Sequence, residues 1–129
     1  MGLFSGFSKT IKMAKYATEL EIVLDAYTSK VPTNFSNGKI ASDLVSSSWK
    51  KYASLFDREL SGKPNKYTVI ISALSESIHS NDLSKGDKHF LMTVLGDLIN
   101  QLEETRFKGF STAEHALILE AKDIFINFK

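Results

Sequence analysis

The side chains that most often bind metals or transfer protons are spread along this sequence rather than grouped. The histidines are His79, His89 and His115, and no two stand three or four residues apart, the spacing that puts two ligands on one helix face. The H-E-x-x-H pattern of helical zinc sites does not occur. Three helix ends could still bring these histidines together, but surface histidines explain the same residues. The sequence therefore predicts neither a metal site nor a cofactor.

The nucleophile and phosphate-binding motifs of common enzyme classes are also missing from the sequence. Without cysteine, the chain has no thiol nucleophile, no thiolate metal ligand and no disulfide. Gly62 and Lys63 lack the upstream glycine and the downstream Ser or Thr of a phosphate-binding loop, and no G-x-S-x-G sequence is present. We therefore predict no catalytic residues and a protein that is not an enzyme. An enzyme whose site is invisible in the sequence is the weakest alternative.

Acidic and amide side chains recur at helical spacing in the last third of the chain. Asp97, Gln101 and Glu104 follow one another on the side of a predicted helix away from its leucines. Glu120 and Asp123 do the same on the next helix. If the two rows face the same way, they form a docking surface for a basic protein, such as a nuclease held by its inhibitor. The alternative is an ordinary solvated helix surface.

The start of the chain, residues 2–15, combines aromatic and basic side chains. Such a segment can form an amphipathic helix that lies on an anionic membrane or docks on a partner. Alternatively, its apolar residues cover the end of the protein's own core. The aromatic and basic residues in question are Phe4, Phe7, Lys9, Lys12 and Lys15.

The charge distribution argues against nucleic acid as the partner. The net charge is only +1, although residues 1–66 carry ten basic against six acidic residues and residues 67–129 carry six against nine. A protein that binds phosphate backbones is usually more basic than this. One basic cluster surrounds Trp49, but Trp49 falls on a predicted apolar stripe, where core packing is its expected role.

Apolar side chains recurring at three- and four-residue steps predict a series of helices. In the third helix, Val69-Ile70-Ile71 is β-branched, so a strand is the alternative there, and the serines at 72, 75 and 77 indicate a half-exposed face. The predicted helices cover residues 8–29, 39–60, 66–80, 86–107 and 111–128.

The last two predicted helices have the clearest boundaries. Gly109 can take the left-handed conformation that ends many helices. Ser111 and Glu114 stand three residues apart, as a capping box at a helix start requires. Because only about three residues then connect the two helices, we expect them to form an antiparallel hairpin.

Length and composition complete the prediction. At 129 residues with 43% apolar residues, the chain can form one domain over 1–129, with residues 1–8 as a separate apolar segment if they do not join it. The absence of cysteine fits a cytoplasmic protein, and no run of residues is apolar enough to form a transmembrane segment. We expect an all-α bundle of about five helices that binds another protein, as an inhibitor of the immunity or antitoxin type. The alternative is a peripheral membrane or assembly protein that uses its N-terminal segment.

Overall fold

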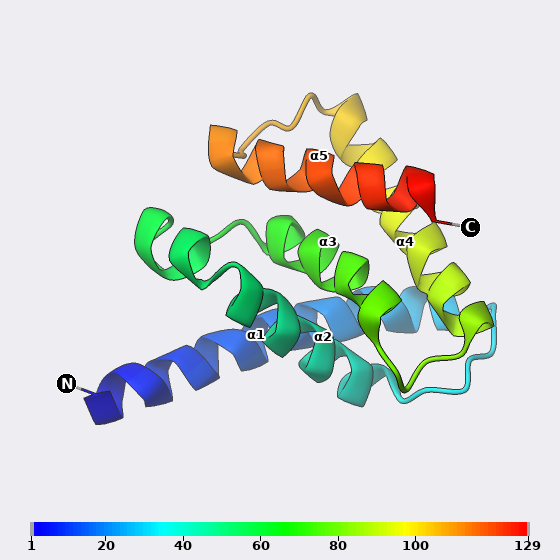
Figure 1. Ribbon diagram of the computed structural model, residues 1–129, viewed down its shortest axis with the longest axis horizontal. Helices are drawn as coiled ribbons and strands as arrows, with labels where there is room; N and C mark the ends of the chain where they lie inside the picture. Colours follow the sequence, from blue (N-terminus) through cyan, green and yellow to red (C-terminus); the bar gives the residue numbers. More distant parts are fainter. Residues whose placement is uncertain (1, 129) are drawn as a thin grey trace.

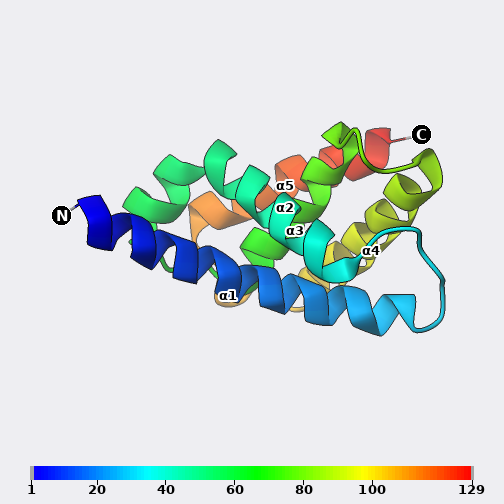
Figure 2. The same cartoon turned by 90° about the horizontal axis from the view of Figure 1, so that it is seen from below.

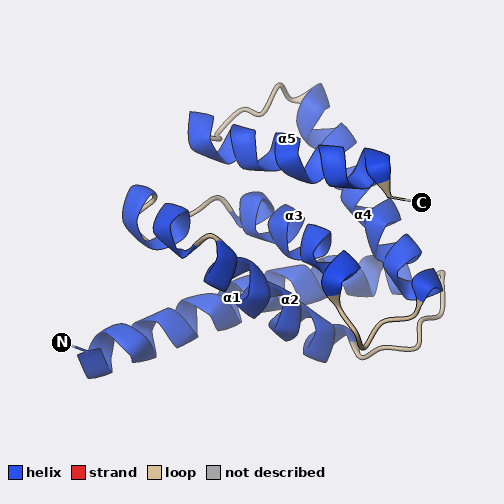
Figure 3. Ribbon diagram, viewed as in Figure 1, coloured by secondary structure: helices blue, strands red, loops and turns tan. Residues whose placement is uncertain are grey.

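The computed structural model describes the backbone of residues 2–128 and the side chains of residues 11–128. Within that part of the chain it contains helices and no β-strand (Figure 3). The predicted all-α bundle is therefore confirmed, and residues 69–71 are helical. The elements in chain order are α1 (Gly2–Thr28), α2 (Asn37–Lys51), the π-helical η1 (Ser54–Glu59), α3 (Lys66–Glu76), the 3-10 helix η2 (Ser77–His79), α4 (Lys85–Glu104) and α5 (Thr112–Asn127).

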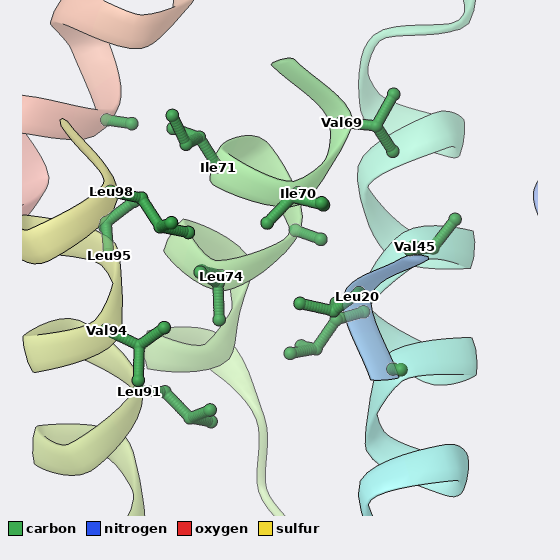
Figure 4. Packing of buried hydrophobic residues seen from close by; sticks show 14 of the residues in the cluster. Leu20, Val45, Val69, Ile70, Ile71, Leu74, Leu91, Val94, Leu95 and Leu98 are labelled. Carbon is green, nitrogen blue, oxygen red and sulfur yellow. The ribbon is translucent and has the colours of Figure 1, made fainter. Parts of the chain in front are cut away.

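Helix α3 lies at the centre of the bundle (Figure 1). It contacts α1, α2, α4 and α5, and every residue from 68 to 77 is buried. Figure 4 shows Ile70, Ile71 and Leu74 between the leucines of α4 on one side and Val45 with Leu20 on the other. A helix covered on all sides needs apolar residues on all sides, and the β-branched run of α3 supplies them.

The expectation of a half-exposed serine face on the third helix is wrong. Ser72, Ser75 and Ser77 are all buried. Each hydroxyl donates to a backbone carbonyl three residues earlier, at distances of 3.0, 2.7 and 2.6 Å. Because the helix itself satisfies these hydroxyls, they can enter the core without losing a hydrogen bond.

The second predicted helix is not continuous. After α2 ends at Lys51, residues 54–59 form a π-helical turn in which the Leu60 N–H donates to the Leu55 carbonyl at 2.9 Å. The wider turn accompanies the burial of Phe56, while Asp57 accepts a hydrogen bond from Nε1 of the fully buried Trp49 at 3.0 Å. A π-helical turn, formed where Trp49 and Phe56 pack into the core, therefore stands where the apolar periodicity predicted a regular α-helix.

Helix α1 runs along one side of the bundle, and its N-terminal turns extend beyond the other helices (Figure 2). Tyr16, Leu20 and Leu24 form its buried side, whereas Ile11 and Ile22 on the opposite side are 55% and 58% exposed. The backbone of residues 2–8 continues the same helix. The helix therefore has an inner and an outer apolar stripe.

The connection between α4 and α5 is longer than predicted, because α4 ends at Glu104 and residues 105–111 form the link. Arg106, Phe107 and Gly109 all have left-handed backbone conformations, with φ values of 55°, 56° and 91°. Helices α4 and α5 contact each other, but the more extensive contact of α5 is with α3 (Figure 1). The left-handed residues end α4 before the apolar pattern does, since an L-residue in that conformation cannot continue a right-handed helix.

Candidate functional site

The start of α5 is the predicted capping box. Ser111 Oγ accepts a hydrogen bond from the Glu114 backbone N–H at 3.2 Å, and Glu114 Oε1 accepts one from the Ser111 N–H at 3.1 Å. Two backbone groups that a helix start leaves unpaired are thereby satisfied. The capping box fixes where α5 begins and therefore which of its residues face outward.

The second oxygen of Glu114 joins α5 to α3. Oε2 accepts hydrogen bonds from the Asn65 N–H at 2.8 Å and from Thr68 Oγ1 at 2.7 Å, both at the start of α3. Burial alone would raise the pKa of the Glu114 carboxyl, but the hydrogen bonds from Thr68, Asn65 and Ser111 outweigh it and hold the pKa below its usual value. The capping pattern identified the local half of this arrangement. The other half could not be read from the sequence, because Thr68 lies 46 residues away.

Helix α5 is apolar on two opposite sides. Leu117, Ile118 and Ala121 are buried against the bundle. Leu119 and Ile126 point away from it and are 46% and 60% exposed. They are seven residues apart, which places them on one side of the helix two turns from each other. The outer side of a surface helix is normally polar, whereas the outer side of α5 carries two large apolar side chains.

Two of the predicted acidic site residues share this exposed side. Glu120 and Asp123 are both exposed, and Asp123 lies between Leu119 and Ile126 in helical register. We call these four residues the α5 outer face. The α5 outer face combines two large apolar side chains with two carboxylates.

The predicted row on α4 has different neighbours. Asp97 accepts a hydrogen bond from the Tyr27 hydroxyl of α1 at 3.1 Å. Burial raises the pKa of Tyr27, and this bond to Asp97 raises it further. Gln101 and Glu104 are exposed. Asp97 is therefore associated with α1. A different carboxylate of α4, that of Glu103, pairs with the Lys122 ammonium of α5, with the Nζ and Oε2 atoms 2.5 Å apart.

Glu120 of the α5 row lies near Tyr52. Burial raises the pKa of Tyr52, and the negative charge of Glu120 adds to that increase. Tyr52 directly follows α2, so Glu120 lies within electrostatic range of α2 and Asp97 within hydrogen-bonding distance of α1. On α5, Glu120 and Asp123 lie exposed in the same part of the helix as the exposed Leu119 and Ile126.

Two hollows flank the C-terminal end of α5. One is lined by apolar side chains that include Ile78, Ile124 and Phe128. The other, toward α4, includes Met92, Phe125 and again Phe128. Asp123 lines the first hollow and Ile126 the second, so both are continuous with the α5 outer face. The spacing of the acidic residues gave no indication of these hollows, because their walls come from three helical segments.

Phe125 is held by a glycine on α4. A Cβ atom added at Gly96 would lie 2.5 Å from Cζ of Phe125, so the ring packs directly on the α4 backbone. Phe125 is nevertheless 37% exposed. The close approach at Gly96 thus positions an aromatic ring that remains accessible at the rim of a hollow.

The predicted basic N-terminal residues divide into two groups. The side chains of Phe4, Phe7 and Lys9 lie outside the described part of the structure. Lys12 is half-buried with its Nζ against Gly62, which follows η1, whereas Lys15 is exposed. A cation beside the C-terminal end of a helix is electrostatically favourable, so Lys12 has a structural contact within the bundle.

The three histidines lie in different surroundings. His79 is exposed at the end of η2, the His89 ring is 6.1 Å from that of Phe128, and the His115 ring is 4.1 Å from that of Phe107. Among the described residues, no three His, Cys, Asp or Glu side chains form a group that could hold a metal ion. The described helices also include none with the length and apolar character needed to span a bilayer.

Comparisons with known protein families, with curated protein sequences and with solved structures find no match to this chain.

Proposed function

We propose that this chain is a protein-binding domain whose partner docks on the α5 outer face. The observation that supports the proposal is the exposure of Leu119 and Ile126 on a helix whose opposite side is part of the core. Covering each of these side chains contributes on the order of 1 kcal/mol from the hydrophobic effect. The adjoining hollows offer further apolar surface into which a partner's side chains would fit.

The expected partner is a protein with an apolar contact surface flanked by lysines or arginines. Glu120 and Asp123 stand beside the apolar pair, and neither forms an ion pair among the described side chains. A second copy of the chain would bring these carboxylates against identical carboxylates, which is electrostatically unfavourable. Basic residues on a different protein would complement them and speed association.

More specifically, we propose that the chain is a stoichiometric inhibitor of the immunity or antitoxin type. Such a protein acts by occupying a surface that its partner needs for activity. A preformed helix suits this role, because little conformational entropy is lost when it binds. The lack of cysteine is compatible with this role in the cytoplasm.

The test compares tagged full-length baits in affinity capture from the native cells. The bait that should fail carries Leu119→Asp and Ile126→Asp. The matched control carries Val31→Asp in the α1–α2 loop, where the side chain is 45% exposed, close to the 46% of Leu119. We expect one protein to be recovered in about equal amount with the wild-type and Val31→Asp baits and lost with the double variant.

Binding is then measured with the purified pair. Glu120→Lys with Asp123→Lys should weaken binding, and added salt should weaken the wild-type complex, if the partner is basic. A partner that binds the double aspartate variant as well as it binds the wild type would contradict docking on the α5 outer face.

A further inference from the structure

The outward side of α1 is a second exposed surface, separate from the α5 outer face. Ile11 and Ile22 are 55% and 58% exposed, and a rotation of 100° per residue places them about 20° apart around the helix axis. In the same register, every other exposed α1 side chain among the described residues lies within about 60° of Ile11, and the buried Tyr16, Leu20 and Leu24 lie on the opposite side. We call this surface the α1 outer face, and its members are Ile11, Ala14, Lys15, Thr18, Ile22, Asp25 and Ala26.

The α1 outer face complements itself when two copies of the helix meet antiparallel. In a two-fold symmetric pair centred at Leu20, residues equally far before and after Leu20 lie at the same level on the two helices. Opposite charges, two small side chains and two β-branched side chains are then matched, and the symmetry repeats each match. The matched residues are Lys15 with Asp25, Ala14 with Ala26, and Thr18 with Ile22.

The polar residues of this face can be covered without leaving a group unsatisfied. The Thr18 hydroxyl donates to the Ala14 carbonyl of its own helix at 2.9 Å. Lys15 and Asp25 form no ion pair among the described side chains, and Asp25 accepts a hydrogen bond only from the neutral Asn37 amide at 2.8 Å. Each therefore keeps its charge for a partner of opposite sign.

We propose that two copies of this chain associate through the α1 outer face as an antiparallel dimer. Helix α1 runs along one side of the bundle, so a second copy can approach it (Figure 2). Covering Ile11 and Ile22 supplies the affinity, and the pairing of Lys15 with Asp25 selects the antiparallel orientation, because a parallel pair would bring each charge against its own copy.

The size of the contact sets its strength. One helix from each chain forms less than a standard interface, so we expect roughly micromolar association. This inference is independent of the protein-binding proposal, since the two surfaces share no residue.

Sedimentation velocity of the full-length protein over a range of concentrations tests the inference. Ile22→Asp should weaken dimerisation by at least about tenfold. Lys15→Glu and Asp25→Lys should each weaken it by at least about fivefold, because like charges then meet in two symmetric contacts. An equimolar mixture of these two charge variants should dimerise again, since each chain supplies the charge that the other requires.

The matched controls are Lys85→Glu and Glu104→Lys, which make the same charge changes at exposed positions of α4. Each should dimerise as the wild type does. Circular dichroism of every variant checks the helical fold.

Cross-linking tests the orientation, because the chain contains no cysteine of its own. A short bis-maleimide should join Ala14→Cys chains to Ala26→Cys chains in a mixture. Neither variant should be joined to itself, since identical positions lie about 18 Å apart along the paired helices.

A wild type that stays monomeric at millimolar concentration would overturn the proposal. So would a mixture of the Lys15→Glu and Asp25→Lys variants that stays monomeric, or cross-linking of either cysteine variant to itself. A monomeric wild type that loses a captured protein on Ile22→Asp would assign the α1 outer face to that protein and also overturn the dimer.

Discussion

Helices α3 and α5 are both apolar around most of their circumference, but their surroundings differ. Helix α3 contacts four other α-helices and is buried along its length. Helix α5 packs mainly on α3 and α4 (Figure 1). Its outer side exposes Leu119 and Ile126. The fold itself explains why α3 is apolar, whereas it leaves the outer side of α5 unexplained. That difference is the reason for proposing a second molecule on α5.

The largest expected effect comes from a leucine of α3. Leu74 is fully buried, so Leu74→Ala should lower the free energy of unfolding by about 2 to 5 kcal/mol through lost burial and a cavity. Chemical denaturation followed by circular dichroism measures it. A loss below about 1 kcal/mol would mean that α3 is not the central helix and would remove the basis of the comparison.

The second largest loss of stability is expected at Glu114, whose carboxylate joins α5 to α3. Glu114→Gln should lower the free energy of unfolding by about 2 kcal/mol near neutral pH, because hydrogen bonds to a charged group are lost.

The pH dependence of that loss has a defined sign. The pKa of Glu114 is lowered in the folded state, so its contribution is present above the unfolded value near 4.5 and disappears as pH falls through the lower folded pKa. Denaturation curves of both proteins from neutral pH into this acid range should converge. A difference that stays constant would mean that the charge of Glu114 is not what stabilises the junction.

A smaller effect is expected where α5 meets α4. Gly96→Ala should gain about 1 kcal/mol in helix propensity and lose about 1 to 3 kcal/mol because its Cβ displaces the Phe125 ring, for a net loss of roughly 1 kcal/mol. In a Phe125→Ala background the same substitution should become stabilising. A double-mutant cycle in denaturant measures the coupling, and additive effects would show that Phe125 does not pack on Gly96.

The smallest effect on stability is expected on the α5 outer face. Leu119→Ala makes the same chemical change as Leu74→Ala but should alter the free energy of unfolding by only about 0.5 kcal/mol, since Leu119 is half exposed. The affinity of the Leu119→Ala variant for the partner should nevertheless fall about tenfold, as expected when an apolar residue covered at an interface is truncated. Calorimetric titration measures the affinity, and a large loss of stability without a loss of affinity would assign Leu119 to the core.

Features that depend on neighbouring residues could be predicted from the sequence. The inner leucine stripe of α4 and the capping box of Ser111 and Glu114 follow from spacings of three and four residues, and the structure confirms them. Features that depend on distant contacts could not. The π-helical turn accompanies the hydrogen bond from Trp49 to Asp57. Arg106 and Phe107 adopt left-handed conformations although neither is a glycine, so their residue types do not indicate the turn.

In the candidate site too, the features set by neighbouring residues could be predicted and those set by distant contacts could not. Helical spacing identified Glu120 and Asp123, which lie on the exposed side of α5. It did not identify Leu119 and Ile126, because apolar residues in a helix are read as core until the neighbours of that helix are known. The hollows beside Phe128 require Ile78 and Met92 from other elements, so no local pattern could have predicted them.

Hydrogen–deuterium exchange of the protein with and without its captured partner tests the role of α5 most directly. In the free protein, the amides of α5 should exchange faster than those of α3, because α5 is covered on one side only. Adding the partner should slow exchange in α5 and leave α3 unchanged. Protection that appears on α1 or α2 while α5 exchanges as before would contradict docking on the α5 outer face.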